Sequence, residues 1–255
     1  MRILMMGDVV GKPGRRGIQK LLPELREELG VDLAIANAEN AAGGLGLTPE
    51  TAQELYGAGV DVLTTGNHTW AKKEIIPYLD TEAPIVRPAN FPPGTPGRGY
   101  LLYKDALIVS VIGRVFMQPA DDPFRIVDQV LDAVANRARV IIVDCHAEAT
   151  SEMGAMGWYL DGRVSAVLGT HTHVGTVDAR VLPKGTAFIT DVGMVGPRDS
   201  VIGNGVDEVL ERFLTPMHVR LTVPSGVVSF NAVLVDVDDE TGLAHSIDRI
   251  DREVA

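Results

Sequence analysis

The sequence predicts an α/β fold with mixed sheets, and three observations support this prediction. Short apolar runs rich in Val, Ile and Leu recur along the chain, and their brevity and β-branched content are typical of buried strands. Helical patterns separate several of these runs, as in proteins whose strands lie between layers of helices. Towards the carboxyl terminus, apolar and polar residues alternate, which indicates antiparallel strands.

The predicted elements follow one another without a convincing linker, so we expect one domain over residues 1–255. Thr48, followed by proline, predicts the start of a helix. The segments 218–223 and 228–238, separated by Pro-Ser-Gly, predict an antiparallel hairpin. The Pro- and Gly-rich segment 87–100 predicts a long surface loop and a candidate rim for a binding site. Further strands are expected at residues 2–6, 31–36, 60–65, 106–112, 139–144, 164–169 and 186–190, and helices at 15–29, 48–59 and 122–138.

The composition is that of a folded, acidic protein. Hydrophobic residues make up 45% and charged residues 22% of the 255 positions, which is enough for a substantial core. The 23 basic and 34 acidic residues give a net charge of −11, which disfavours stable nucleic-acid binding because phosphate backbones repel it. A small anionic substrate remains compatible with this charge, because a bound cation inverts the local field.

Cysteine usage and apolar runs indicate the compartment. Cys145 is the single cysteine, which excludes an internal disulfide and a thiolate-rich metal cluster, and we expect it to be a small buried side chain. No apolar run approaches the ~18 residues of a membrane span, so no membrane association is expected. The first apolar run ends at Gly7, which is too short for the core of a signal peptide. We therefore expect a cytoplasmic protein.

Polar side chains follow five of the predicted strands, at the carboxyl end of each. In open α/β sheets this is the edge where ligands bind, so five such positions indicate a single site. They are Asp8 after the first strand, Glu39 and Asn40 in the sequence NAEN after the second, Asn67 and His68 after the third, His146 at the end of a later strand, and His171 and His173 after the next.

The histidine pair in GTHTHV is the most distinctive of these candidates. Side chains two residues apart share a face in extended backbone, so His171 and His173 are predicted to reach one metal cluster. The alternative is a pair of surface histidines in a turn. The small neighbours Gly169 and Gly175 favour metal binding, because they let an ion approach closely.

The other candidates also have structural alternatives. Asp8, Asn40 and Asn67 can each cap a turn, although asparagine oxygens also bind hard cations. Glu39 lies at a strand end where an unpaired buried charge is costly, and a metal would offset that cost. Asn67 and His68 are adjacent, so in extended backbone they would face opposite ways, one towards metal and the other towards substrate.

Three competing motifs fail on inspection. The H-x-E at 146–148 matches zinc deaminases, but those also need P-C-x-x-C. Lys12 is followed by proline, which violates the pattern G-x-x-x-x-G-K-[ST] of the phosphate-binding loop in nucleoside triphosphatases. GGLGLT at 43–48 lacks the third glycine of a dinucleotide-binding fingerprint, because Pro49 stands in that position. His218 and His245 have no acidic or histidine neighbours in the pattern and are expected to be structural.

Taken in order, GD, NAEN, GNH, a single histidine and GTHTH resemble the calcineurin-like metallophosphoesterase superfamily. Within it, NAEN, GNHTW, GTHTHV and TDVGMVGPRDS resemble the YmdB-like group of 2′,3′-cyclic-nucleotide 2′-phosphodiesterases over nearly the whole chain. The resemblance implies a four-layer α/β/β/α sandwich with mixed sheets. The chain departs from the superfamily, as that group does, at three positions: Val10 replaces a histidine, Glu39 replaces the usual bridging Asp, and Thr69 replaces an acidic residue.

The resemblance also implies a ligand set and a chemistry. One ion would be held by Asp8, Glu39, Asn40 and His173, and a second by Glu39 as a bridge with Asn67, His146 and His171. Oxygen and imidazole ligands without sulfur suit iron, manganese or zinc, and the resemblance favours iron or manganese.

The implied reaction is hydrolysis of a small phosphodiester, with 2′,3′-cyclic nucleotides as the expected substrates and 3′-nucleotides as the products. Two cations would activate a water molecule as hydroxide and bind the phosphate, and His68 would act as the general acid for the leaving oxygen. Arg198 is a weak candidate for a phosphate contact, with a surface salt bridge as the alternative. A homo-oligomer is a further expectation that the residues leave open.

Two rival functions remain at this point. An amidohydrolase-type enzyme also uses H-x-H and suits a chain of this length as a (β/α)8 barrel, although in that family the motif closes the first strand. A regulatory protein that senses a nucleotide without turning it over would keep the same pocket. The complete ligand set and the apparent acid His68 favour turnover.

Overall fold

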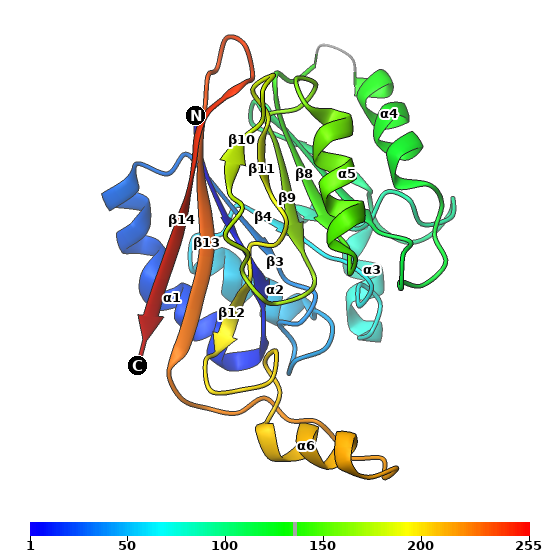
Figure 1. The fold of residues 1–255 in the computed structure, drawn as a ribbon, viewed down its shortest axis with the longest axis vertical. Helices are drawn as coiled ribbons and strands as arrows, with labels where there is room; N and C mark the ends of the chain where they lie inside the picture. The colour runs from blue at the N-terminus through cyan, green and yellow to red at the C-terminus, as the bar shows by residue number, and fades with distance from the viewer. Residues whose placement is uncertain (135–136) are drawn as a thin grey trace.

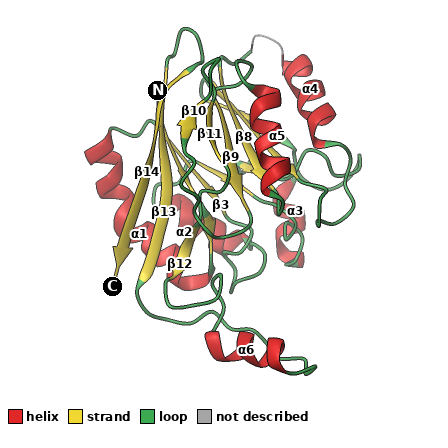
Figure 2. Ribbon diagram, viewed as in Figure 1, coloured by secondary structure: helices red, strands yellow, loops and turns green. Residues whose placement is uncertain are grey.

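The computed structural model describes residues 1–134 and 137–255. Two mixed β-sheets pack face to face, and helices cover both outer faces, as Figures 1 and 2 show. This arrangement confirms the predicted four-layer α/β/β/α architecture. It does not support the barrel of the amidohydrolase alternative, because the described strands form two open sheets.

The first sheet has eight strands and carries most of the amino-terminal half of the chain. Its order is β2-β12-β13-β1-β3-β4-β5, with β14 beside β13. Parallel pairing joins β1, β3, β4 and β5, whereas β13 runs antiparallel to its neighbours β1, β12 and β14. The strands are β1 (Arg2–Met6), β2 (Asp8–Val9), β3 (Leu33–Asn37), β4 (Val62–Thr64), β5 (Ile85–Val86), β12 (Met194–Pro197), β13 (Val228–Val237) and β14 (Ala244–Val254).

The second sheet has six strands in the order β10-β11-β9-β8-β7-β6, with a parallel centre and antiparallel edges. Its strands are β6 (Tyr100–Tyr103), β7 (Ala106–Ile112), β8 (Val140–His146), β9 (Ala166–Thr170), β10 (Arg180–Val181) and β11 (Ala187–Ile189). The helices are α1 (Gly11–Leu29), α2 (Pro49–Gly57), α3 (Ile76–Leu79), α4 (Pro123–Val134), α5 (Thr150–Leu160) and α6 (Val206–Leu214), with a 3-10 turn η1 at Lys73–Ile75.

Three hydrophobic cores lie between the four layers, and the period-two alternation of the strands supplies them. Along β1, Leu4 and Met6 pack in the core beneath α1 and α2, whereas Ile3 and Met5 point the other way into the core between the sheets. Along β7, Ile108 joins the core between the sheets, and its neighbours join the core beneath α4 and α5. Strands buried on both faces explain why the apolar runs in the sequence are nearly continuous.

The predicted hairpin between 218–223 and 228–238 is wrong. Residues 218–223 form no strand, and β13 instead pairs along its length with β14. The buried residues of β14 are Ala244, Ile247 and Ile250, which recur every third position rather than every second. This spacing hides the strand from a search for alternation, and a shift in register near Val237 contributes to it.

The remaining predicted elements are found near their expected positions. The seven other strands appear within a few residues of their predicted bounds, and Thr48 caps α2 in a capping box with Thr51. Of the predicted helix 122–138, residues 135 and 136 lie outside the described part of the chain. Cys145 is buried, as predicted.

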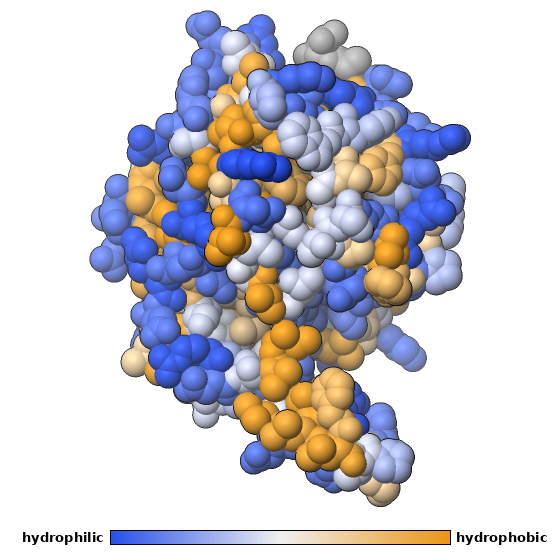
Figure 3. All heavy atoms as spheres, in the orientation of Figure 1, coloured by the Kyte–Doolittle hydropathy of each residue, from blue (hydrophilic) through white to orange (hydrophobic). Residues whose placement is uncertain are grey.

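The helix α6 stands apart from the four layers, at the lower end of the molecule in Figure 1. Its apolar side chains are mostly exposed, and Figure 3 shows apolar surface gathered over this part of the molecule. No helix in the described residues combines the length and the apolar character that crossing a membrane requires.

Candidate metal centre

The predicted site residues lie at one edge of the sandwich, but they come from both sheets. Asp8, Glu39, Asn40, Asn67 and His68 belong to β2 or follow β3 and β4 of the eight-stranded sheet. His146 ends β8, and His171 and His173 follow β9, in the six-stranded sheet. The expectation of one sheet edge is therefore corrected to two adjoining edges, which meet across the core between the sheets.

One cluster, which we call the first half of the centre, contains Glu39, Asn67, His146 and His171. The Nε2 atom of His146 lies 3.1 Å from Glu39 Oε1, 2.9 Å from Asn67 Oδ1 and 3.1 Å from His171 Nδ1. Donor atoms of Glu39, His146 and His171 all lie within 4.8 Å of one another, as they do around a metal ion. The glycine Gly66 makes this packing possible, because a Cβ there would lie 2.1 Å from the His146 ring.

The second half of the centre contains Asp8, Asn40 and His173. The Nε2 atom of His173 lies 3.2 Å from Asn40 Nδ2 and 3.6 Å from Asp8 Oδ1. The other carboxylate oxygen of Asp8 accepts a hydrogen bond of 2.9 Å from the main-chain N–H of His171. That bond joins the two halves.

Each histidine in the centre presents one ring nitrogen to the cluster and has the other held from outside. His146 Nδ1 lies 2.9 Å from the Thr170 hydroxyl, and His173 Nδ1 lies 2.9 Å from the main-chain oxygen of Ile202. His171 Nε2 lies 3.1 Å from a carboxylate oxygen of Glu148. Outer partners of this kind fix the orientation of histidines that bind metals.

The backbone of the histidine pair differs from the prediction. His171 and His173 have φ values of 106° and 65°, so the segment is not extended. The two rings therefore do not share a strand face, and each reaches a different half of the centre. Asp191 holds the turn between them, because its carboxylate accepts hydrogen bonds from both the main-chain N–H and the hydroxyl of Thr172.

The backbone at Asn67 and His68 is likewise not extended, because residues 67–70 form a turn. The expected opposite orientation of the two side chains is therefore wrong: Asn67 Nδ2 lies 2.9 Å from His68 Nε2. The main-chain N–H of His68 donates to Glu39 Oε2 at 3.0 Å. The His68 ring thus lies beside the first half of the centre, where Asn67 Oδ1 contacts His146.

A buried polar layer lies beneath the histidines. Asp144 accepts hydrogen bonds from Thr64, Thr170 and Asn37, and Thr170 in turn contacts His146. Burial raises the pKa of Asp144 to about 6. Of the functional candidates that sequence reasoning missed, Asn37 stood in the NAEN motif and Glu148 stood in the sequence HAE, so both were visible but had no assigned role.

Opposite charges pair within each half of the centre. Burial alone would lower the pKa of His146, but the negative charge of Glu39 raises it to about 9. Burial alone would raise the pKa of Asp8, but the positive charge of His173 holds it at about 2. Burial lowers the pKa of His68, and so does the positive charge of His146. Carboxylates that stay ionised at this depth need a cation beside them.

The donor set fits bound metal ions. Asp8 is completely buried, and its Oδ1 atom has no hydrogen-bond partner among the described residues. A buried carboxylate oxygen without a donor is costly, and a cation would satisfy it. Carboxylate, amide and imidazole donors together suit a first-row transition metal.

Arg198 is engaged elsewhere. Its guanidinium forms ion pairs with Asp199 at 3.0 Å and Glu253 at 3.1 Å. The structure therefore shows the surface salt-bridge alternative for Arg198.

Of the other two histidines, His218 is exposed and His245 lies 3.5 Å from Asp238.

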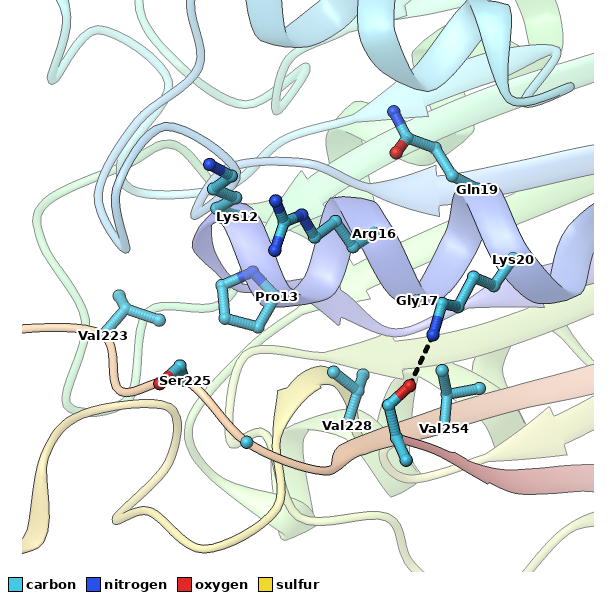
Figure 4. Close-up of a pocket in the computed structure, with 12 residues that line it drawn as sticks. Lys12, Pro13, Arg16, Gly17, Gln19, Lys20, Val223, Ser225, Val228 and Val254 are labelled. Carbon is cyan, nitrogen blue, oxygen red and sulfur yellow. Dashed lines mark hydrogen bonds between the residues drawn. The ribbon is translucent and has the colours of Figure 1, made fainter.

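A cavity lies away from the centre. It has a volume of about 550 Å³ and lies between α1 and the segment 223–228 (Figure 4). None of the predicted ligands lines it, and one of its basic side chains, Lys20, donates a hydrogen bond to the main-chain oxygen of Ala255. Three basic side chains and no histidine line this cavity, so it is not a metal site. The lining residues are Lys12, Pro13, Arg16, Gly17, Gln19, Lys20, Val223, Ser225, Gly226, Val228, Val254 and Ala255.

With this geometry established, comparison with known proteins identifies the family. The family model described as YmdB-like protein matches residues 4–250. The chain belongs to the YmdB-like family. A Bacillus subtilis (strain 168) relative of this YmdB-like chain, named 2′,3′-cyclic-nucleotide 2′-phosphodiesterase, is 48% identical over 254 residues, which cover 98% of the chain and 96% of the relative.

Solved structures agree with the YmdB-like fold. A crystal structure of a hypothetical protein from Thermus thermophilus matches with a TM-score of 0.93 and 46% identity, covering 99% of both chains. A crystal structure of a novel phosphatase from Mycoplasma pneumoniae matches with a TM-score of 0.94 and 33% identity, covering 99% of this chain and 93% of the other. The family and these relatives confirm the prediction that the chain is a phosphodiesterase enzyme.

Proposed function

We propose that this YmdB-like phosphodiesterase hydrolyses 2′,3′-cyclic nucleotides to 3′-nucleotides at a centre of two metal ions, and that residues 1–255 act as one domain. The name of the Bacillus subtilis relative supports the substrate class. One observation carries the metal centre: donor side chains from two sheets converge at one edge, and the buried Asp8 Oδ1 among them has no hydrogen-bond partner within the described chain.

In this proposal the second half of the centre, Asp8, Asn40 and His173, would hold one ion together with Glu39. The other residues of the first half, Asn67, His146 and His171, would hold the second ion, with Glu39 as the bridge. Iron or manganese is the expected metal, with zinc as the alternative, because the donors are oxygen and imidazole without sulfur. When bound, the ions would lower the pKa of a water molecule and offset the negative charge of the phosphate.

His68 would supply the proton for the leaving ribose oxygen. Its Nε2 atom lies beside Asn67, and its main chain is bonded to Glu39, so its ring is held at the edge of the first half. The lowered pKa makes the protonated imidazole a stronger acid, although a smaller fraction of the enzyme carries that proton at neutral pH. The rate is therefore expected to fall as the pH rises.

The test is elemental analysis of the purified, metal-loaded protein together with turnover of three substrates: 2′,3′-cAMP, 3′,5′-cAMP and an unrelated phosphodiester. We expect two ions per chain, preference for 2′,3′-cAMP, and 3′-AMP as the chromatographically identified product. At most one ion per chain would contradict the dinuclear centre, and equal rates on all three substrates would contradict the substrate class. Tight binding of 2′,3′-cAMP without turnover would instead support a nucleotide-sensing role.

A further inference from the structure

An unusual turn follows β7 and places a phenylalanine at its tip. The turn covers residues 114–117, and the main-chain N–H of Met117 points back to the Arg114 carbonyl at 3.4 Å. Phe116 occupies the third position with a φ of 62°. A turn with a left-handed residue in this position normally has glycine or asparagine there.

Phe116 carries two costs at once. A bulky side chain in the left-handed region is an uncommon and strained conformation. In addition, the side chain of Phe116 is 88% exposed, so it contributes little to the hydrophobic core. A residue that is strained and contributes no burial is unexplained by folding, and strain of this kind concentrates at functional sites.

The turn is fastened to the segment that carries the first half of the centre. β7 ends level with His146, and Gly113 N–H donates to the His146 carbonyl at 2.9 Å. The Glu152 carboxylate at the start of α5 accepts hydrogen bonds of 2.9–3.0 Å from the main-chain N–H groups of Arg114 and Val115. The chain from Gly113 to Phe116 can span at most about 11 Å, so the Phe116 backbone lies within about that distance of the bond between Gly113 and His146.

The far side of the turn is also fastened. The Arg114 guanidinium lies 3.5 Å from the Asp122 carboxylate, and Asp121 exchanges hydrogen bonds with Asn90. The backbone that carries the Phe116 ring is therefore held by hydrogen bonds and an ion pair on both sides of the turn. A braced aromatic ring at the surface is suited to stacking, because little conformational freedom is lost when a ligand binds.

We propose that Phe116 is a specificity-determining residue that stacks on the base of the nucleotide substrate. This inference rests on the proposed function, because it assigns a base to the phosphodiester at the same centre. In a 2′,3′-cyclic nucleotide the ribose separates the base from the reacting phosphate, so the base lies at the rim when the phosphate lies between the two halves. An aromatic ring can stack on any base, because every base has a π-face. Purines are favoured, because their larger rings cover more of the aromatic face.

The test compares two cyclic phosphates that differ only in the base. One is 2′,3′-cAMP, and the other is the 2′,3′-cyclic phosphate of methyl ribofuranoside, which has a methoxy group in place of adenine. Phe116→Ala is expected to lower kcat/KM for 2′,3′-cAMP by about 5- to 100-fold, the range for loss of one base–aromatic stack. The same substitution should leave the base-free substrate within about twofold, and Phe116→Trp should restore the preference for adenine.

Phe213 provides a matched control, because it is another phenylalanine with 84% exposure and lies on α6. Phe213→Ala should leave both substrates unchanged. A second control separates a functional from a structural role: Phe116→Gly should raise the thermal midpoint, since it relieves the left-handed strain, while it abolishes the preference for adenine. A residue needed for packing would lower the midpoint instead.

An equal loss on both substrates in Phe116→Ala would overturn the stacking role, as would a wild-type enzyme that does not distinguish them. If the wild-type enzyme hydrolyses neither substrate, the proposed function fails. The stacking role of Phe116 can then still be tested by measuring ligand binding with calorimetry. Adenosine 3′-phosphate should then bind the metal-loaded wild type more tightly than Phe116→Ala, whereas methyl riboside 3′-phosphate should bind both alike. Equal binding of adenosine 3′-phosphate to the two proteins would overturn it.

Discussion

The first half of the centre and the second half differ in what holds their histidines. In the first half, His171 is 19% exposed, and its outer nitrogen faces Glu148, a side chain that is itself 51% exposed. In the second half, His173 is 10% exposed, and its outer nitrogen faces a main-chain oxygen, which no substitution can remove. The outer partner of His171 is therefore a replaceable surface carboxylate, whereas that of His173 belongs to the backbone.

Removing the charge that both halves share is expected to have the largest effect. Glu39→Gln keeps the size of the side chain but loses the carboxylate that contacts His146 and the main chain of His68. Loss of several kcal/mol of charge stabilisation corresponds to a fall in kcat of at least about 1,000-fold. Turnover and metal content should be measured together, with circular dichroism as the folding control. Near-normal turnover with two ions bound would show that Glu39 is no bridge.

The next test separates the roles of two histidines: His171, which belongs to the first half, and His68, which lies beside it. His171→Ala should lose metal and activity together, whereas His68→Ala should keep its metal and lower kcat by roughly 10²–10⁴, the usual contribution of a general acid. The His68→Ala defect should be large for a cyclic nucleotide and small for a p-nitrophenyl diester, because nitrophenolate leaves without a proton. Loss of metal from His68→Ala would make His68 a ligand, and equal defects on both substrates would leave it a positioning residue.

The difference between the halves is tested most directly at Glu148. Glu148→Gln should weaken metal binding by about 10- to 100-fold, the usual effect of losing a partner that orients a histidine ligand. The loss should fall on the first half, so that mild chelation takes the metal content from two ions to one. Glu240→Gln, which removes another exposed carboxylate, should keep both. Simultaneous loss of both ions in Glu148→Gln would contradict the independence of the halves.

The smallest expected effect is a pH dependence of the metal-free protein. Because the pKa of His146 is raised from 6.5 to about 9, its contribution to stability is full below pH 6.5 and is lost as the pH rises through 9. The pKa of Asp8 is lowered from 3.8 to about 2, so its contribution is full above pH 3.8 and is lost as the pH falls towards 2.

In the metal-loaded protein, stability should no longer fall as the pH rises from 6.5 to about 9, because a histidine binds metal only when it has lost its proton. The gap in thermal midpoint between loaded and metal-free protein should therefore widen between about pH 6 and about pH 9, by roughly 3–10 °C for a chain of this size. Scanning calorimetry of both forms across this range checks it. A constant gap would show that His146 does not change protonation when metal binds.

The sequence alone predicted much of the architecture, because the signals involved are local. Buried strands such as β7 and β8 are continuous runs of Val and Ile, and Thr48 with its proline marks the start of α2. The list of site residues was also available, since each candidate stands directly beside an apolar run. What these residues hold remains a proposal, although the structure brings all of them except Arg198 to one edge.

Only the tertiary structure decided how those residues meet. Alternation predicted a strand at 218–223, yet that segment forms no strand, while β14 pairs with β13 despite its irregular spacing. Extended geometry was assumed for His171 and His173, but contacts with Asp8 and Asp191 hold the segment in left-handed backbone. The proximity of Glu148 to His171 and the fastening of the Phe116 turn to Glu152 arise from contacts between distant segments, which a single sequence does not encode in any local pattern.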